Sequence, residues 1–120
     1  MATHWNRIIE RTTDDVVILE VWGGPLSVSD SGDRLLKKIQ DVVEQGWRRI
    51  LLNLSEVQYV DSVGLGEVVQ GTRTVRDAGG HLAVCGLVKQ MRALFSTTKL
   101  ETVIPVFRSE QEGVDGLARL

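Results

Sequence analysis

The sequence of 120 residues contains one cysteine, Cys85, so no disulfide can form within the chain. Cys85 ends the apolar run Leu82–Cys85, which predicts a small buried side chain, because apolar surroundings keep a thiol protonated and unreactive. The N-terminus lacks the apolar segment of a secretory signal, and an unpaired cysteine is typical of a reducing compartment. Both observations favour a cytoplasmic protein.

The sequence has no excess of positive charge and no long hydrophobic run. Its 14 basic and 16 acidic residues give a net charge of −2, whereas a nucleic-acid-binding surface needs clustered lysine and arginine. The only basic pairs are Lys37-Lys38 and Arg48-Arg49, which a solvated surface explains. Every apolar run is far shorter than the roughly 20 residues that span a membrane. We therefore expect neither direct nucleic-acid binding nor membrane insertion.

Residues that build catalytic or metal centres are scarce. His4 and His81 are the only histidines, and neither is placed beside a nucleophile, as a general base must be. No residues have metal-ligand spacing, and Gly64-Leu65-Gly66 lacks the lysine and the spacing of a phosphate-binding P-loop. A phosphoaspartate receiver would need an acid pair after an early strand, where this chain has Gly23-Gly24. We expect no catalytic residue, no metal and no cofactor.

The sequence does contain the pattern of one α/β domain, residues 1–120, without linkers or repeats. Hydrophobic residues make up 42% and charged residues 25%, which is typical of a globular protein. Periodicity predicts a strand within 1–11, a strand at 16–22, a helix between 26 and 46, a strand at 50–54, a helix from 62, a strand at 81–85, a helix from 88, a strand at 103–107 and a helix after 109. We expect an initial hairpin followed by parallel crossovers, with the last strand at an edge because Pro105 cannot donate to a ladder.

Glycines and a serine mark the helix ends. Gly46 and Gly79-Gly80 are expected to end the first two long helices. Ser109 opens the last helix as part of an S-x-x-E capping box. Gly113 and Gly116 each cost that helix about 1 kcal/mol relative to alanine, so we expect it to fray.

Trp5, Trp22 and Trp47 each flank a predicted strand. Packing at the ends of the sheet is the ordinary explanation for such residues, because aromatic side chains bury a large area. An exposed tryptophan could instead anchor a partner. The sequence leaves both interpretations open.

The chain is organised around residues 53–66, where an apolar strand ends, a polar turn follows and a helical pattern begins. The apolar stripe of this helix is predicted to comprise Leu65, Val68, Val69, Thr72, Val75 and Arg76. Glu67 and Gln70 fall mostly on the other side, so we expect them to be exposed. Asp61 and Ser62 both stand where a helix N-cap is needed.

Two interpretations of Ser62 follow from this position. Ser62 can be a helix cap, since serine and aspartate are preferred there. Alternatively, its hydroxyl protrudes beside Gly64 and Gly66 and is a site of phosphorylation. The helix macrodipole would favour a nearby phosphate by roughly 0.3–1 kcal/mol.

The run Asp61-Ser62-Val63-Gly64-Leu65-Gly66, preceded by Asn53-Leu54-Ser55 and Tyr59-Val60, resembles the signature of the STAS domain family, specifically of the bacterial anti-sigma factor antagonists. The predicted element order fits that family over most of the chain. The resemblance implies a small mixed sheet of about five strands, with helices packed mainly on one face. It also implies that the serine after the aspartate, here Ser62, is phosphorylated by a partner that is both serine kinase and anti-sigma factor.

The resemblance implies a function as well. The unphosphorylated protein would bind the anti-sigma factor and free a sigma factor, phosphorylation would end binding, and a serine phosphatase would restore it. The expected partner surface comprises Asp61, Ser62, Val63, Gly64, Leu65, Gly66, Glu67 and Gln70. ATP, Mg²⁺ and the catalytic base would belong to the kinase, so this chain would not be an enzyme, and we expect a monomer or weak dimer. The alternative is a STAS scaffold or regulatory subunit of a stress-signalling assembly or of a lipid or anion transport complex.

Two positions depart from the pattern of the family. Ser27 follows Leu26 where family members often have an acidic residue, and Asn53 stands where many have aspartate. Both changes remove negative charge near the expected partner surface.

Overall fold

The computed structural model describes residues 7–22 and 34–120, and within them five strands form one sheet. They are β1 (Arg7–Thr13), β2 (Val16–Trp22), β3 (Arg49–Asn53), β4 (His81–Cys85) and β5 (Val106–Phe107), and they lie side by side in sequence order. β1 and β2 form an antiparallel hairpin, whereas β2 to β5 run parallel. The predicted mixed sheet is confirmed, and β5 lies at an edge of it, as predicted.

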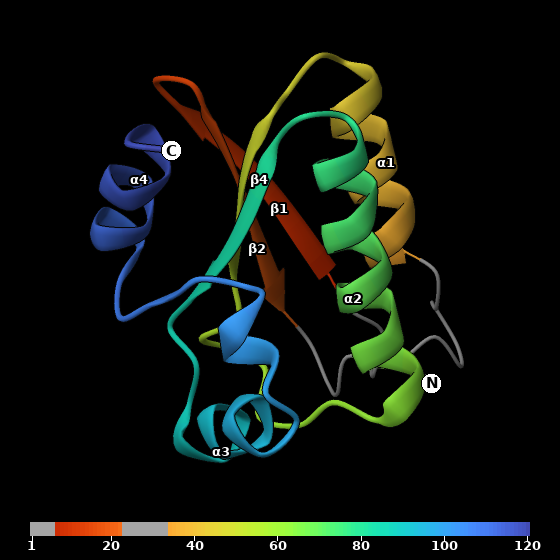
Figure 1. Cartoon of the computed structure of the whole chain (residues 1–120), viewed down its shortest axis with the longest axis vertical. Coiled ribbons are helices and arrows are strands. Elements are labelled where there is room, and N and C mark those ends of the chain that lie inside the picture. Colours follow the sequence, from red (N-terminus) through yellow and green to blue (C-terminus); the bar gives the residue numbers. More distant parts are fainter. Residues whose placement is uncertain (1–6, 23–33) are drawn as a thin grey trace.

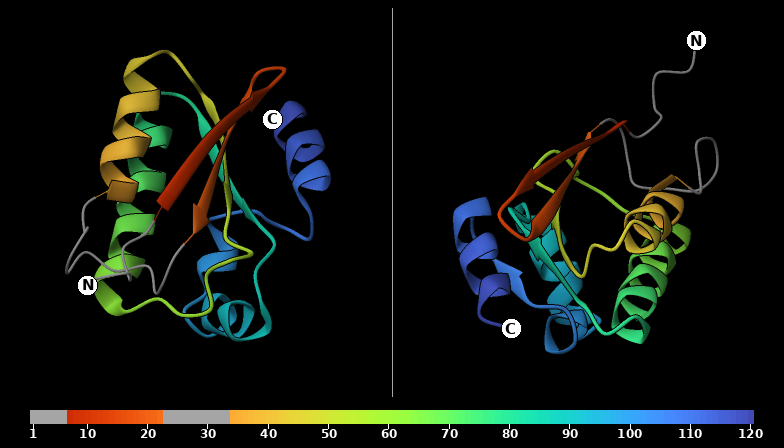
Figure 2. Two further views of the ribbon diagram at one scale, coloured as in Figure 1. Left: turned by 180° about the vertical axis from the view of Figure 1, so that it is seen from behind. Right: turned by 90° about the horizontal axis from the view of Figure 1, so that it is seen from above.

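The described residues also form four α-helices, α1 (Arg34–Glu44), α2 (Ser62–Asp77), α3 (Lys89–Thr97) and α4 (Glu110–Ala118), and one 3₁₀ helix, η1 (Leu100–Thr102). Side chains of α1, α2 and α3 share one apolar core with the sheet, while α4 packs on the opposite face. Figures 1 and 2 show α1 and α2 side by side, with α4 alone across the sheet. The prediction that helices lie mainly on one face is therefore confirmed.

Strand alternation divides the core into two parts. Val17, Leu19 and Val21 of β2 belong to the core under α1–α3, and Val16 and Ile18 belong to the smaller core under α4. All five side chains are at most 3% exposed. Because the middle of the sheet is covered on both faces, its strands read as nearly continuous apolar runs in the sequence.

The glycines predicted to end helices do so through the same hydrogen-bonded turn. Gly46 has a φ of +106°, and its N–H donates to the Val43 carbonyl while the Trp47 N–H donates to Val42. Gly79 has a φ of +86° and ends α2 with the corresponding pair of bonds. These are Schellman motifs, in which glycine adopts a left-handed conformation that other residues rarely adopt.

The segment before β5 differs from the prediction of a strand at 103–107. Lys99 adopts a left-handed conformation, with a φ of 62°, and the chain then turns through η1. Ile104 is 1% exposed and enters the core, whereas Val103 is 50% exposed. The apolar run here is thus shared between a turn and a two-residue strand, which short-range patterning cannot separate.

Helix α4 approaches the sheet closely because two of its residues lack a side chain. A Cβ added to Gly113 would collide with Leu51, and one added to Gly116 would collide with the Phe107 ring. At the start of the helix, the Ser109 Oγ accepts a hydrogen bond from the Glu112 N–H at 3.2 Å, as the capping box predicted. The glycines that weaken α4 as an isolated helix are thus the residues that let it dock.

The structure also places Cys85 and two of the three tryptophans. The prediction that Cys85 is buried is confirmed, and that burial raises the pKa of its thiol to about 12. Trp47 is partly buried against the larger core, whereas Trp22 is 37% exposed at the end of β2. Trp5 lies outside the described residues, as do His4 and Ser27.

A polar cluster ties α4 to the hairpin and to β3. The Arg11 guanidinium bonds both carboxylate oxygens of Glu110, with Nη1 at 3.1 Å from Oε1, and it also pairs with Glu20 at 3.0 Å. The Asn53 Nδ2 donates to the Glu110 Oε2 at 2.8 Å. Arg11 lowers the pKa of Glu110, and the Asn53 bond adds to that effect. The ion pair therefore stabilises the fold above the unfolded pKa of about 4.3 and stops doing so as the pH falls through the folded value.

Asn53 is explained by this cluster. An aspartate there would face the Glu110 carboxylate at hydrogen-bond distance with no proton to donate, whereas asparagine supplies the donor. Its own Oδ1 accepts from the Ser55 N–H at 3.0 Å, a bond that aspartate would keep. Asparagine at position 53, where many family members have aspartate, is thus explained by the Glu110 carboxylate at the start of α4.

We predict that Asn53→Asp lowers the free energy of unfolding by about 1–2 kcal/mol at about pH 7, because it replaces a donor to a charged group with a like charge. The loss should shrink at about pH 4, where one of the two carboxyls takes up a proton. Urea unfolding at both pH values measures the effect, with the same change in a Glu110→Gln background as the control. An equal loss at both pH values, or in both backgrounds, would contradict the explanation.

Candidate functional site

The loop that leads into α2 is held by every third residue. Leu54 and Val57 are 0% exposed and Val60 is 6% exposed, and all three belong to the larger core. The Leu54 N–H donates to the Cys85 carbonyl at 3.0 Å, and the Val57 N–H donates to Leu54 at the same distance. The side chains between these anchors are exposed, so the loop presents a surface whose backbone is fixed from below.

Asp61, not Ser62, caps α2. Asp61 has the extended conformation of an N-cap residue, with φ −84° and ψ 176°, and its Oδ1 accepts from the Gly64 N–H at 2.7 Å. The Asp61 carbonyl accepts the first helical bond, from the Leu65 N–H at 2.9 Å. Ser62 is consequently the first residue inside the helix. Of the two interpretations of Ser62, the cap is ruled out.

The Ser62 side chain is exposed at this helix start. In the part of the chain that the structure describes, no group forms a hydrogen bond with its hydroxyl. A Cβ placed on Gly66 would have no atom within 4 Å, so the surface one turn further along is open. A hydroxyl in this position is accessible to another protein.

Two apolar side chains close to Ser62 in the sequence are exposed. Tyr59 is 58% exposed and Val63 is 51% exposed, and both are among the large hydrophobic residues that the fold leaves uncovered. Exposed aromatic and aliphatic side chains around a polar centre are typical of protein-binding sites. The predicted partner surface left out Tyr59, although its place between Val57 and Val60 was a usable signal.

The predicted site residues divide into a surface set and a buried set. Ser62, Val63, Gly66 and Gln70 are exposed, and Asp61 is partly buried. Leu65 is also partly buried, and Gly64 is buried, so these two support the site from beneath. The role of the surface set in partner binding stays a prediction.

The prediction that Glu67 is exposed on the partner surface was wrong. Glu67 is 6% exposed, and its Oε1 accepts a hydrogen bond from the Leu36 N–H in the first turn of α1 at 2.9 Å. The physical reason is that α2 packs against α1 as well as against the sheet. Gly71 permits this close packing because a Cβ at its position would collide with the Ile39 side chain. Glu67 thus satisfies one of the backbone donors that a helix start leaves without an intrahelical partner.

The described segments offer neither a metal centre nor a membrane span. In residues 7–22 and 34–120, no three His, Cys, Asp or Glu side chains gather where they could hold a metal ion. Over the same ranges, each helix is too short or too polar to cross a bilayer.

Comparison with known proteins agrees with this geometry. The family model described as "STAS domain" matches residues 7–113. The anti-sigma-B factor antagonist of Staphylococcus aureus is 31% identical over 101 residues, which cover 84% of this chain and 93% of that protein.

Solved structures show the same fold. The crystal structure of TM1081 from Thermotoga maritima superposes with a TM-score of 0.82 at 24% identity, covering 92% of this chain and 94% of that one. The phosphorylated form of the Bacillus cell fate determinant SpoIIAA gives a TM-score of 0.69 at 22% identity, covering 92% and 97% of the two chains. With a family model that spans the sheet and the Ser62 site, the chain belongs to the STAS domain family.

Proposed function

We propose that this chain is an anti-sigma factor antagonist in which Ser62 is the regulatory phosphorylation site. The observation that carries the proposal lies at the start of α2. Asp61 caps the helix, so the exposed Ser62 hydroxyl is not needed for capping. The name of the S. aureus relative, an anti-sigma-B factor antagonist, supports the same function.

In the unphosphorylated state, the surface around Ser62 docks on an anti-sigma factor. Tyr59 and Val63 supply apolar contact area, and the absence of a side chain at Gly66 lets the partner's backbone approach the helix. Occupation of the anti-sigma factor by this chain then frees the sigma factor. In this scheme the chain and its partners act in the cytoplasm.

Phosphorylation of Ser62 ends this binding by a local change of charge. The phosphate adds about −1.5 to −2 charges next to the Asp61 carboxylate. In a docked interface, the like charges and the buried phosphate cost several kcal/mol, which lowers affinity by orders of magnitude. The helix itself tolerates the phosphate, because the macrodipole of α2 favours an anion at its N-terminus.

The chemistry of the switch belongs to the partners. Ser62 is the substrate hydroxyl, while a serine kinase that is also the anti-sigma factor supplies ATP, Mg²⁺ and the catalytic base. A serine phosphatase removes the phosphoryl group and restores binding. The chain is thus a substrate and a ligand in this scheme, not a catalyst.

The proposal is tested by affinity capture from a lysate of the native host with wild-type, Ser62→Ala and Ser62→Asp baits. A serine kinase should be retained on the first two baits and at least about tenfold less on Ser62→Asp. The captured kinase should then phosphorylate wild type and a Ser55→Ala control, which removes another exposed serine of the same loop. Equal capture of transporter or scaffold components on all three baits would overturn the proposal and favour the alternative STAS function.

The Gly66→Ala variant should change partner binding and the stability of the fold in opposite directions. Because the added methyl meets no atom and alanine favours a helix, the variant should gain about 0.5–1 kcal/mol in the free energy of unfolding. Its affinity for the captured kinase should nonetheless fall by about tenfold, since the methyl intrudes on the docking surface. Asp77→Ala, at the far end of α2, is the control that should bind as wild type. Full binding by Gly66→Ala would contradict close approach at this position.

A further inference from the structure

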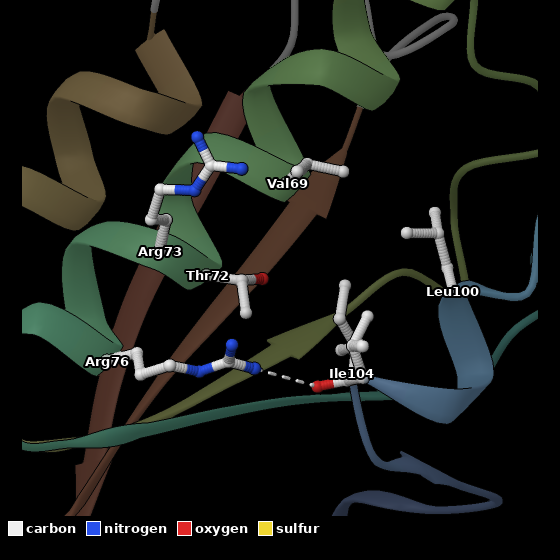
Figure 3. Close-up of a pocket in the computed structure, with 7 residues that line it drawn as sticks. Val69, Thr72, Arg73, Arg76, Leu100 and Ile104 are labelled. Carbon is white, nitrogen blue, oxygen red and sulfur yellow. Dashed lines mark hydrogen bonds between the residues drawn. The ribbon is translucent and has the colours of Figure 1, made fainter.

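A hollow of about 160 Å³ lies between α2 and the turn that contains η1, well away from Ser62. Figure 3 shows Val69 and Thr72 on the helix side and Leu100 and Ile104 on the facing side. Thr72 is 8% exposed and Ile104 is 1% exposed, so these two are the most buried residues of its lining. A cavity of roughly 150 Å³ accommodates a benzene-sized group, and this hollow has comparable room.

Two arginines stand at the rim of this hollow. Arg73 and Arg76 are exposed residues three positions apart on α2, so both guanidinium groups start from the same side of the helix. Within residues 7–22 and 34–120, neither arginine forms an ion pair. Arg76 donates only to the Val103 carbonyl, at 3.5 Å, which is the outer limit of a hydrogen bond. A carboxylate would offer Arg76 a stronger, charge-assisted bond.

We propose that this hollow binds a small carboxylate that carries one ring-sized apolar group. The apolar group would fill the space above Thr72 and Ile104, and the carboxylate would bond to Arg73 and Arg76. The Thr72 hydroxyl already donates to the Val68 carbonyl at 2.9 Å, so recognition of the negative charge is left to the arginines. Guanidinium groups suit this task because they are always charged and can bond a carboxylate through two donors.

The geometry favours a small ligand over an extended peptide. A second hollow, lined in part by His81, Pro105 and Leu120, lies beyond Arg76 and Val103. Both hollows are lined by Thr72, Arg76 and Val103, and the hydrogen bond from Arg76 to the Val103 carbonyl lies where they meet. A peptide running along the groove would have to break this contact throughout its stay, whereas a single ring-sized group fits on one side of it.

The site is separate from the phosphorylation switch. Thr72 and Arg76 follow Ser62 by ten and fourteen residues on the same helix, which corresponds to about 15–21 Å along its axis. Binding of the carboxylate therefore does not depend on whether Ser62 is a phosphorylation site. The two proposals can fail independently.

An NMR titration of the amide resonances with benzoate tests the inference, with benzyl alcohol as the uncharged counterpart. We expect saturable shifts confined to residues 69–76 and 100–104, and binding of benzyl alcohol at least about tenfold weaker. Arg73→Gln and Arg76→Gln should each weaken benzoate binding by about fivefold or more, because each removes one guanidinium. Arg92→Gln, an exposed arginine on α3 that does not line the hollow, is the matched control and should bind as wild type.

The same spectra show whether each variant is folded, so loss of binding cannot be confused with unfolding. The inference is overturned if benzoate gives no saturable shift up to about 10 mM, or if both arginine variants bind as tightly as the Arg92→Gln control. It is also overturned if an acidic peptide with apolar side chains saturates these resonances while benzoate does not. That last result would assign the groove to a protein partner.

Discussion

The hydrogen bond from the Gly64 N–H to the Asp61 carboxylate is the contact on which the rest of the site depends. A helix start must have its free backbone donors satisfied, and serine and aspartate can both do this. Because aspartate does so here, the next residue enters the helix with an exposed hydroxyl that has no structural task. In the proposed function, this bond holds the start of the helix, so phosphorylation of Ser62 would change partner binding while the helix stays intact.

The rest of the fold keeps this helix start in place. Leu54, Val57 and Val60 anchor the incoming loop, and the Schellman turn at Gly79 ends α2 at the opposite end. Glu67 joins the first turn of α1 to α2 little more than one turn beyond Ser62. The loop around a phosphate at Ser62 would therefore not rearrange, and the added charge would act mainly on the interface with the partner.

Much of this arrangement is predictable from residue type and spacing. The strands at Val16–Trp22 and His81–Cys85, and the helix ends at Gly46 and Gly79, follow from local rules that tertiary structure did not override. Glu67 was mispredicted because helical periodicity identifies the apolar face but not a second helix packed on a polar position. The turn at Lys99 was missed because short-range patterning cannot separate a turn from a strand within an apolar run. The motif located Ser62, but the backbone angles were needed to assign the cap to Asp61.

The most direct test of this account compares the unfolding free energies of Asp61→Ala and Ser62→Ala with that of the wild type. Loss of the cap in Asp61→Ala should lower stability by about 1 kcal/mol, because the Gly64 N–H loses its acceptor. Ser62→Ala should stay within about 0.5 kcal/mol of wild type, as expected for an exposed side chain without a structural contact. If Ser62→Ala lost as much stability as Asp61→Ala, Ser62 would be a structural residue, and the separation of the switch from the fold would be contradicted.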